Sequence, residues 1–344
     1  MYYETCAAND GCTLAFQTSI PLNNPSQTPT PAPNTLILLL HGFSGSSAYF
    51  TRNFAALSGW DPDTHYGSPT PRTAHWVVAP DMRGHGQSGR PSGGYHVARL
   101  AADLHDLIDH LRRKHAAMAP GTNNLQIVAI GCSIGAAILW TYIELYGGCS
   151  DFAGFVFVDQ APLQDALWFS ENDEDNWGPD KHHKGCYDEQ TLTSARKAWM
   201  LPYPEMNATY EGLVNECLGY RQPNDNTLVT KVQCEIDEAF FADISAQCDG
   251  KWLGRLMADH TRNDHREAIE MIDLPTLVMA GEKSGCFPLQ GMLETARRIK
   301  KARRESMKGK VAISVFESGH WLFYEDAKRF NREVLEFVDD FVSG

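Results

Sequence analysis

Short apolar runs alternate with longer segments of helical periodicity along most of the chain. Compact apolar runs bounded by turn-forming residues occur at 35–40, 76–79, 125–130, 155–158, 276–280 and 311–316. Segments with the spacing of amphipathic helices occur at 97–115, 134–146, 289–304 and 325–342. Continuous apolar runs are typical of parallel strands that are buried on both faces. The alternation therefore predicts an α/β fold with a doubly wound, mostly parallel sheet.

Two regions depart from this rhythm. Residues 1–20 alternate like a β-hairpin, with Asp10-Gly11 as its turn. Residues 162–269 contain no comparable strand pattern but many aromatic residues, and we expect them to form a mostly helical insertion. The predicted organisation is a core of residues 1–161 and 270–344, with residues 162–269 as a cap inserted into it.

Composition and charge narrow the class of protein. The 344 residues include 30 Lys+Arg and 43 Asp+Glu, which gives a net charge of −13, and 43% are hydrophobic. This composition is typical of a globular protein, and its acidic balance argues against nucleic-acid and anionic-membrane partners. No apolar run approaches the roughly 20 residues that span a bilayer, and no secretory signal is visible. We expect a soluble, cytoplasmic protein.

The cysteine pattern indicates neither a metal site nor a disulfide framework. Nine cysteines are scattered along the chain without a CxxC pair, and a reducing compartment favours free thiols. His182, His183 and Cys186 form an HHxxC grouping, but adjacent ligands usually point apart, so no metal is predicted. Neither a P-loop nor a dinucleotide-binding GxGxxG pattern after a strand occurs, so no cofactor is implied.

One motif carries nucleophilic chemistry. Gly131-Cys132-Ser133-Ile134-Gly135 follows the strand predicted at 125–130 and opens the helix predicted at 134–146. In this strand–turn–helix context, G-x-S-x-G makes a strained turn that exposes the serine hydroxyl above the sheet. Ser133 is therefore the candidate nucleophile.

Further motifs occur in a fixed order along the chain. His41-Gly42-Phe43 follows the strand at 35–40, the sequence PDMRGHGQS spans residues 80–88, and Ser318-Gly319-His320 follows the last strand. Together with the motif around Ser133, these segments resemble the α/β-hydrolase superfamily over about residues 35 to 344, apart from the insertion. The local sequence around these motifs is similar to that of haloperoxidase-like and zearalenone-type lactonase-like hydrolases of the serine branch.

The resemblance implies roles for particular residues. His320 stands where the family places the base that a serine nucleophile needs at neutral pH. The backbone N–H groups of Phe43 and Ile134 occupy the positions of the two oxyanion donors. His41 and His85 lie in motif turns, and we interpret them as structural.

The family's serine and histidine act together with an acidic residue as a catalytic triad. At the position of this acidic residue the chain departs from the family's common sequence pattern. Many members of the family read G-x-x-D after the strand at 276–280, but here Ser284 occupies the acid's position. Asp159 and Glu282 each follow a strand at its carboxyl end. Some branches, including zearalenone-type lactonases, carry the acid some two dozen residues after the nucleophile, and Asp159 lies 26 residues after Ser133. We therefore predict Asp159 as the acid, with Glu282 as the second choice.

These residues predict a serine hydrolase of carboxylic esters or lactones. Serine at the elbow argues against dehalogenases and epoxide hydrolases, which use aspartate there. Two alternatives use the same triad: cofactor-free haloperoxidase or perhydrolase activity, and hydrolysis of C–C bonds. An alternative of another class is a non-catalytic ligand receptor on this scaffold.

The insertion suggests the kind of ligand. Its aromatic residues predict a bulky, largely apolar small-molecule ester or lactone, and the position of Asp159 favours a zearalenone-like macrolactone. The aromatic residues that we expect to bind substrate are Trp168, Trp177, Trp199, Tyr203 and Trp321. The same aromatic surface could also supply a homodimer interface.

Overall fold

The computed structural model describes residues 1–23, 32–59, 75–121, 125–164, 187–202, 205–223, 225, 227–302 and 310–341. A single eight-stranded sheet organises this part of the chain, in the order β1-β2-β4-β3-β5-β6-β7-β8. The strands are β1 (Tyr2–Ala7), β2 (Thr13–Thr18), β3 (Thr35–Leu40), β4 (Trp76–Pro80), β5 (Gln126–Cys132), β6 (Gly154–Val158), β7 (Thr276–Gly281) and β8 (Val311–Phe316). The strands from β4 to β8 are parallel, whereas β1 and β2 add an antiparallel edge. The predicted doubly wound, mostly parallel sheet is confirmed.

The central strands are apolar throughout because both of their faces are covered. In β3, Leu36, Leu38 and Leu40 face one hydrophobic cluster, whereas Ile37 and Leu39 face another. Successive side chains of a strand point to opposite faces of the sheet. A strand buried on both sides therefore reads as a continuous apolar run, which is the pattern seen in the sequence.

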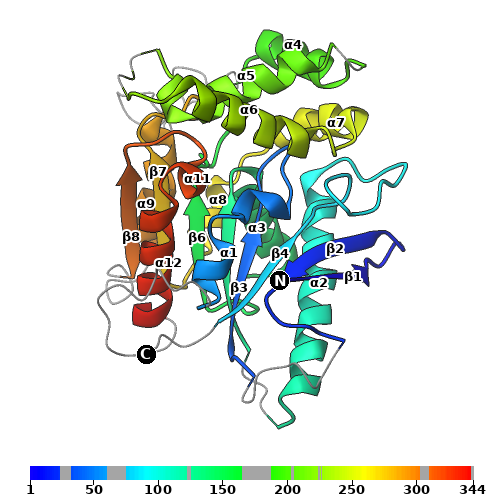
Figure 1. The fold of residues 1–344 in the computed structure, drawn as a ribbon. Helices are drawn as coiled ribbons and strands as arrows, with labels where there is room; N and C mark the ends of the chain where they lie inside the picture. The colour runs from blue at the N-terminus through cyan, green and yellow to red at the C-terminus, as the bar shows by residue number, and fades with distance from the viewer. Residues whose placement is uncertain are drawn as a thin grey trace.

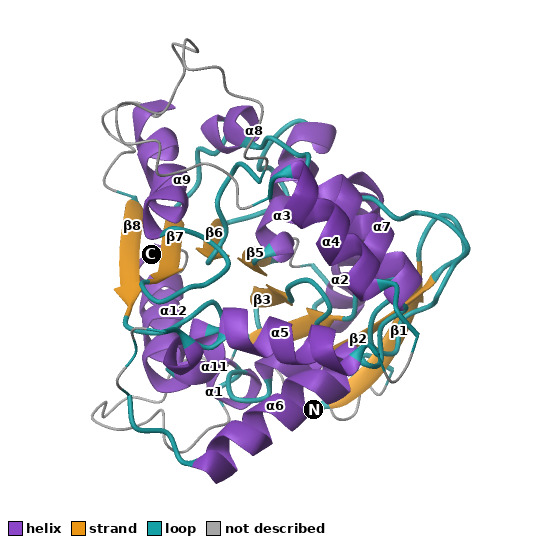
Figure 2. Ribbon diagram, turned by 90° about the horizontal axis from the view of Figure 1, so that it is seen from above, coloured by secondary structure: helices purple, strands orange, loops and turns teal. Residues whose placement is uncertain are grey.

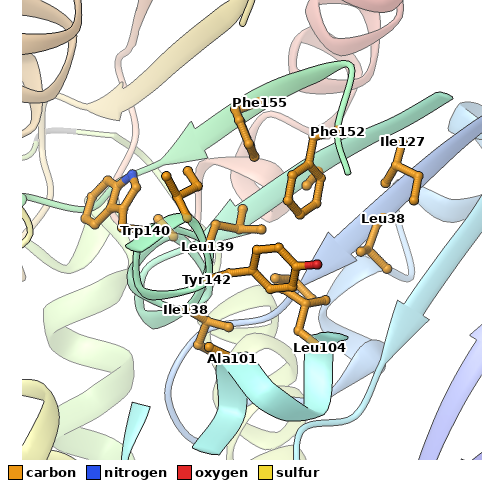
Figure 3. Close-up of a cluster of buried hydrophobic side chains, with 14 of the residues drawn as sticks. Leu38, Ala101, Leu104, Ile127, Ile138, Leu139, Trp140, Tyr142, Phe152 and Phe155 are labelled. Atoms are coloured by element: carbon orange, nitrogen blue, oxygen red, sulfur yellow. The ribbon is translucent and has the colours of Figure 1, made fainter. Parts of the chain in front are cut away.

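Helices form a layer on each face of the sheet. One layer contains α2 (Val97–Met118), α3 (Ile134–Tyr146) and α9 (Leu289–Ala302), and the other contains α1 (Phe54–Leu57), α11 (Leu322–Glu325) and α12 (Ala327–Phe341). Figure 3 shows the first layer, with side chains of α2 and α3 packed over the central strands. The sheet is thus a rigid platform whose carboxyl edge can position side chains.

The N-terminal hairpin forms as its sequence predicts. β1 and β2 pair antiparallel, with Tyr2 opposite Thr18 and Ala7 opposite Thr13. The turn contains Asp10-Gly11, and Gly11 adopts a φ of 83°. The eight cysteines in the described part of the chain are not disulfide-bonded; Cys186 lies outside it.

Most of the described residues in the predicted insertion (residues 162–269) are helical. It contains α4 (Glu189–Trp199), α5 (Asn207–Cys217), a 3₁₀ turn at Gly219–Arg221, α6 (Lys231–Ser245), α7 (Gly250–His260) and most of α8 (Arg266–Glu270). Figures 1 and 2 show α4 to α7 lying over the carboxyl ends of the parallel strands. Leu163 forms a β-bridge with Asp264, so the two ends of the insertion lie side by side.

The C-terminal helix differs from its prediction. The pattern at 325–342 predicts one helix, but the chain leaves helical geometry at Asp326 between α11 and α12. The Asp326 side chain accepts a hydrogen bond from the Arg329 N–H and thereby caps α12. Over the described residues, none of the helices is both long and apolar enough to cross a bilayer.

Candidate active site

Ser133 occupies a strained turn between β5 and α3. Its φ of 53° and ψ of −125° are unusual for a residue other than glycine. The turn is possible because its neighbours are glycines: a Cβ on Gly131 would lie 2.6 Å from the Ala136 nitrogen, and one on Gly135 would lie 2.6 Å from the Leu40 oxygen. The turn presents the Ser133 hydroxyl at the carboxyl edge of the sheet, where Ser133 lines a cavity.

Asp159 and His320 meet at the same edge, 161 residues apart in sequence. Asp159 directly follows β6, and His320 follows β8. The Nδ1 atom of His320 lies 2.6 Å from Oδ1 of Asp159, and both side chains are buried. His320 also lines the cavity that Ser133 borders. Of the two candidate acids, the structure brings Asp159 to His320, whereas Glu282 is exposed to solvent.

The Asp159 carboxylate is held from several sides. Its Oδ2 accepts a 2.7 Å hydrogen bond from the Gly281 N–H, and its Oδ1 accepts one of 2.7 Å from the Ser284 hydroxyl. Asp159 itself has a positive φ of 48°, which is unusual for a residue other than glycine. Ser284 thus stands at the family's usual acid position. Its hydroxyl donates a hydrogen bond to Asp159, the acid that follows the neighbouring strand β6.

Two opposing effects act on the pKa of His320. Burial by itself lowers the pKa of the imidazole, but the neighbouring Cys286 and the Asp159 carboxylate raise it, and the net direction is well above the ordinary value. A carboxylate that accepts the Nδ1 proton stabilises the imidazolium form. His320 therefore keeps its proton to higher pH than a free histidine does.

The two predicted oxyanion donors lie on either side of Ser133. Ile134 is the first residue of α3, and Phe43 lies in the turn after β3 and lines the cavity. That turn approaches Ser133 closely, since a Cβ on Gly42 would lie 3.3 Å from the Ser133 Cβ. Neither N–H donates to another described residue, so both remain available to a ligand.

A cavity of about 410 Å³ lies between the sheet edge and the insertion. Trp199 and Trp321, two of the five predicted binding aromatics, line it. Trp321 stacks on Phe241 of α6, and the Phe43 ring packs edge-on against Trp199 at 5.2 Å. The other three predicted binding residues, Trp168, Trp177 and Tyr203, and the HHxxC grouping of His182, His183 and Cys186 lie outside the described residues.

His41 and His85 are buried away from the cavity lining. The His41 Nδ1 contacts the Gly42 carbonyl, and its Nε2 accepts a hydrogen bond from the Met82 N–H. Burial lowers the pKa of His41 to about 4 and that of His85 to about 3, so both are neutral at physiological pH. Their contacts fix the turns after β3 and β4.

Three segments meet backbone to backbone behind His320. A Cβ on Gly281 would lie 2.2 Å from the Gly319 oxygen, and one on Gly319 would lie 2.3 Å from the Cys217 oxygen. The half-buried Glu325 carboxylate accepts hydrogen bonds from the N–H groups of Gly319 and Gly219, and its partial burial raises its pKa to about 7. We call this contact of Gly219, Gly281, Gly319 and Glu325 the glycine joint; it ties the insertion to the loop that carries His320.

Sequence reasoning missed several residues that border or support the site. Glu216, Cys217 and His260 come from the insertion, and Cys286 comes from the loop after β7; all of them line the cavity. No local motif marks them, because they reach the cavity only through the folded arrangement of α5, α7 and that loop. Ser284 had a signal: it places a hydroxyl at the usual acid position, and a hydroxyl there can donate a hydrogen bond to a carboxylate after the neighbouring strand.

Comparisons with known proteins find a matching family and similar structures. A profile of the alpha/beta hydrolase family matches residues 37–333. A Synechocystis protein whose name proposes a non-heme chloroperoxidase is 24% identical over 266 residues, covering 76% of this chain and 80% of its own. A bromoperoxidase from Bacillus anthracis has a similar structure (TM-score 0.70, 19% identity, 98% and 100% of the two chains). An enol-lactonase from Burkholderia xenovorans LB400 is also similar (TM-score 0.65, 16% identity, 98% and 100%).

Proposed function

The chain belongs to the alpha/beta hydrolase family, and from this premise we propose that it is a serine hydrolase of neutral carboxylic esters or lactones. One observation carries the proposal: Ser133 and His320 line the same cavity, and Asp159 holds the Nδ1 atom of His320 at 2.6 Å. A serine hydroxyl is a weak nucleophile at neutral pH, and a base oriented by a carboxylate is what it needs.

The proposed reaction begins with Ser133. Its Oγ attacks the acyl carbon of the substrate while Nε2 of His320 takes the hydroxyl proton. The Asp159 carboxylate stabilises the resulting imidazolium through Nδ1, and the hydrogen bonds from Gly281 and Ser284 keep that carboxylate in place. The negative charge that develops on the acyl oxygen is stabilised by the N–H groups of Phe43 and Ile134.

The intermediate then collapses to an acyl-enzyme on Ser133. His320 gives its proton to the leaving alkoxide; in a lactone this alkoxide belongs to the same molecule as the acyl group. Water, activated by His320, attacks the ester carbonyl and releases the acid. The reaction balances without a cofactor, since one water is consumed for each bond cleaved.

The cavity supports a bulky, neutral substrate. Its volume of about 410 Å³ lies within the range of about 300–1,000 Å³ that small-molecule sites occupy. Phe43, Trp199, Met257, Phe287 and Trp321 line it, and apolar rings favour apolar ligands. The structural relatives include an enol-lactonase and several esterases. A macrolactone remains the finer form of the proposal, motivated by the position of Asp159.

Covalent labelling tests the nucleophile. A fluorophosphonate should label the wild-type protein with a stoichiometry of one, and Ser133→Ala should abolish the labelling. Ser318→Ala is the matched control, because the Ser318 hydroxyl is buried near His320 yet makes no hydrogen bond with the described residues. Labelling that persists in Ser133→Ala would refute the assignment. A folded wild-type protein that is not labelled at all would favour a ligand receptor.

A substrate panel tests the reaction. We expect hydrolysis of p-nitrophenyl esters, small lactones and macrolactones by the wild type, with no hydrolysis by Ser133→Ala. Hydrolysis of simple esters without any macrolactone turnover would remove the macrolactone form of the proposal. Turnover confined to diketones, or to esters in the presence of peroxide, would instead support C–C hydrolysis or perhydrolysis.

A further inference from the structure

Two cysteines from different parts of the chain lie beside His320. Cys217 ends α5 in the insertion, and Cys286 lies in the loop after β7. Their sulfur atoms are 3.6 Å apart, and each lies within 4.8 Å of a ring nitrogen of His320. Cys217 and His320 are buried, Cys286 is half-buried, and all three line the cavity. The mechanism proposed above uses neither thiol.

The spacing of the two sulfur atoms suits a tetrahedral metal ion. Zinc binds thiolate sulfur at about 2.3 Å, so two sulfurs on one tetrahedral zinc lie about 3.8 Å apart. The observed 3.6 Å requires an adjustment of only a few tenths of an ångström. Two cysteines and one histidine with an open fourth position is a donor set that zinc uses in proteins.

The histidine is also oriented as metal ligands usually are. A metal-bound imidazole generally donates its other N–H to a carboxylate, which fixes the ring and strengthens the ligand. His320 already makes this contact with Asp159 through Nδ1. Because Nδ1 is occupied, Nε2 is the nitrogen left for a metal, and it is the atom that the proposed mechanism needs for Ser133.

We propose that Cys217, Cys286 and His320 form an inhibitory binding site for a thiophilic divalent cation, with Zn²⁺ as the ion of best fit. Binding displaces one proton from each thiol and, where His320 is protonated, the proton on its Nε2, so that two thiolates and one neutral imidazole balance the charge of the ion. The cation occupies the lone pair of Nε2 and prevents His320 from accepting the Ser133 proton. The inhibitory effect rests on the proposed function, whereas binding of the ion does not.

The binding test uses Ser133→Ala protein, reduced and then freed of reductant, so that catalysis plays no part. Titration with Co²⁺ should give a thiolate-to-cobalt charge-transfer band that saturates at one equivalent and is lost when Zn²⁺ is added. Introducing Cys217→Ser or Cys286→Ser into the Ser133→Ala protein should abolish the band. Cys248→Ser is the matched control, because Cys248 is partly buried in the insertion but does not line the cavity. Asp159→Asn should weaken binding about 10–100-fold.

The inhibition test uses the otherwise wild-type protein. Zn²⁺ should abolish hydrolysis, and a chelator should restore it. In Cys217→Ser and Cys286→Ser the half-inhibitory Zn²⁺ concentration should rise at least about tenfold, each variant being compared with its own metal-free rate. Thermal melts of the metal-free proteins establish that each variant is folded, and Cys→Ala versions serve where a serine variant is not.

The outcomes separate the two proposals. No cobalt band in Ser133→Ala, or a band that survives both cysteine substitutions, overturns the metal site and leaves the hydrolase proposal intact. A band of the expected stoichiometry in a protein that hydrolyses nothing supports the metal site and counts against the proposed function. Zinc inhibition that is unchanged in both folded cysteine variants also overturns the site.

Discussion

The cavity is bounded by two surfaces that are built differently. Its floor comprises Ser133, His320 and the loops after β3, β7 and β8; its roof comprises the cavity-lining residues of α4, α5 and α7. In the floor, polar groups are held by short hydrogen bonds and backbone segments touch directly. In the roof, the small apolar cluster of Leu192, Trp199, Met206, Leu253 and Met257 provides the packing.

The floor is built for the precise placement of reacting groups, whereas the roof is built in a way that can determine which substrates fit. Atoms that take part in bond cleavage must be held within a fraction of an ångström, and hydrogen-bonded backbone provides that precision. Apolar packing against small side chains, such as Ala198, Ala208 and Gly212, leaves room that substitutions can fill. The floor should therefore tolerate little change, whereas the roof should tolerate changes that alter which substrates fit.

The largest expected effect comes from Asp159→Asn in the floor. We expect kcat to fall about 10³–10⁴-fold with the fold intact, because the amide no longer stabilises the His320 imidazolium. Glu282→Gln, the matched control at the exposed alternative position, should stay near wild-type activity. Steady-state kinetics on a p-nitrophenyl ester measure both. A nearly active Asp159→Asn together with an inactive Glu282→Gln would reverse the assignment of the acid.

A pair of glycine substitutions compares floor and roof directly. Gly281→Ala places a Cβ 2.2 Å from the Gly319 oxygen and should cost about 1–3 kcal/mol of unfolding free energy. Gly212→Ala, in α5, meets nothing within 4 Å and should add about 0.5–1 kcal/mol, because alanine favours a helix. Urea unfolding of the two variants measures this. Equal effects of the two substitutions would remove the contrast between floor and roof.

The smaller of the two expected effects on kcat concerns Ser284. Ser284→Ala removes one hydrogen bond to the Asp159 carboxylate, which should lower kcat about tenfold since a hydrogen bond to a charged group contributes about 1.5–3 kcal/mol and part of it is compensated. KM should stay nearly constant, and Ser284→Thr, which keeps a hydroxyl, should recover most of kcat. If Ser284→Ala raises KM alone, Ser284 contributes to substrate binding rather than to positioning the acid.

The sequence predicts the sheet well because its signal is local. Each central strand is buried on both faces, so the apolar run that marks it lies within a few consecutive residues. The turn at Ser133 is equally local, since its glycines are required by contacts with Ala136 and with the adjacent strand. The split between α11 and α12 escaped prediction because the periodicity continues across Asp326 while the backbone does not.

The contacts around the site are harder to predict because they join distant segments. Ser284 and Asp159 are 125 residues apart, and Cys217 and Cys286 are 69 apart. Each pair meets only because parallel strands end at one edge of the sheet and the insertion folds back over that edge. Residue types and spacings within one segment do not indicate such a contact.

The glycine joint limits how this scaffold can be recombined. A chimera that exchanges residues 162–269 for the insertion of a relative would keep the two neighbouring ends at Leu163 and Asp264. It would nevertheless replace Cys217 and Gly219, which pack against Gly319, and would change the position of the Gly219 N–H, one of the two groups that donate hydrogen bonds to Glu325. A transplant intended to change substrate range would thus disturb the loop carrying His320, unless residues 217–219 were retained from the original chain.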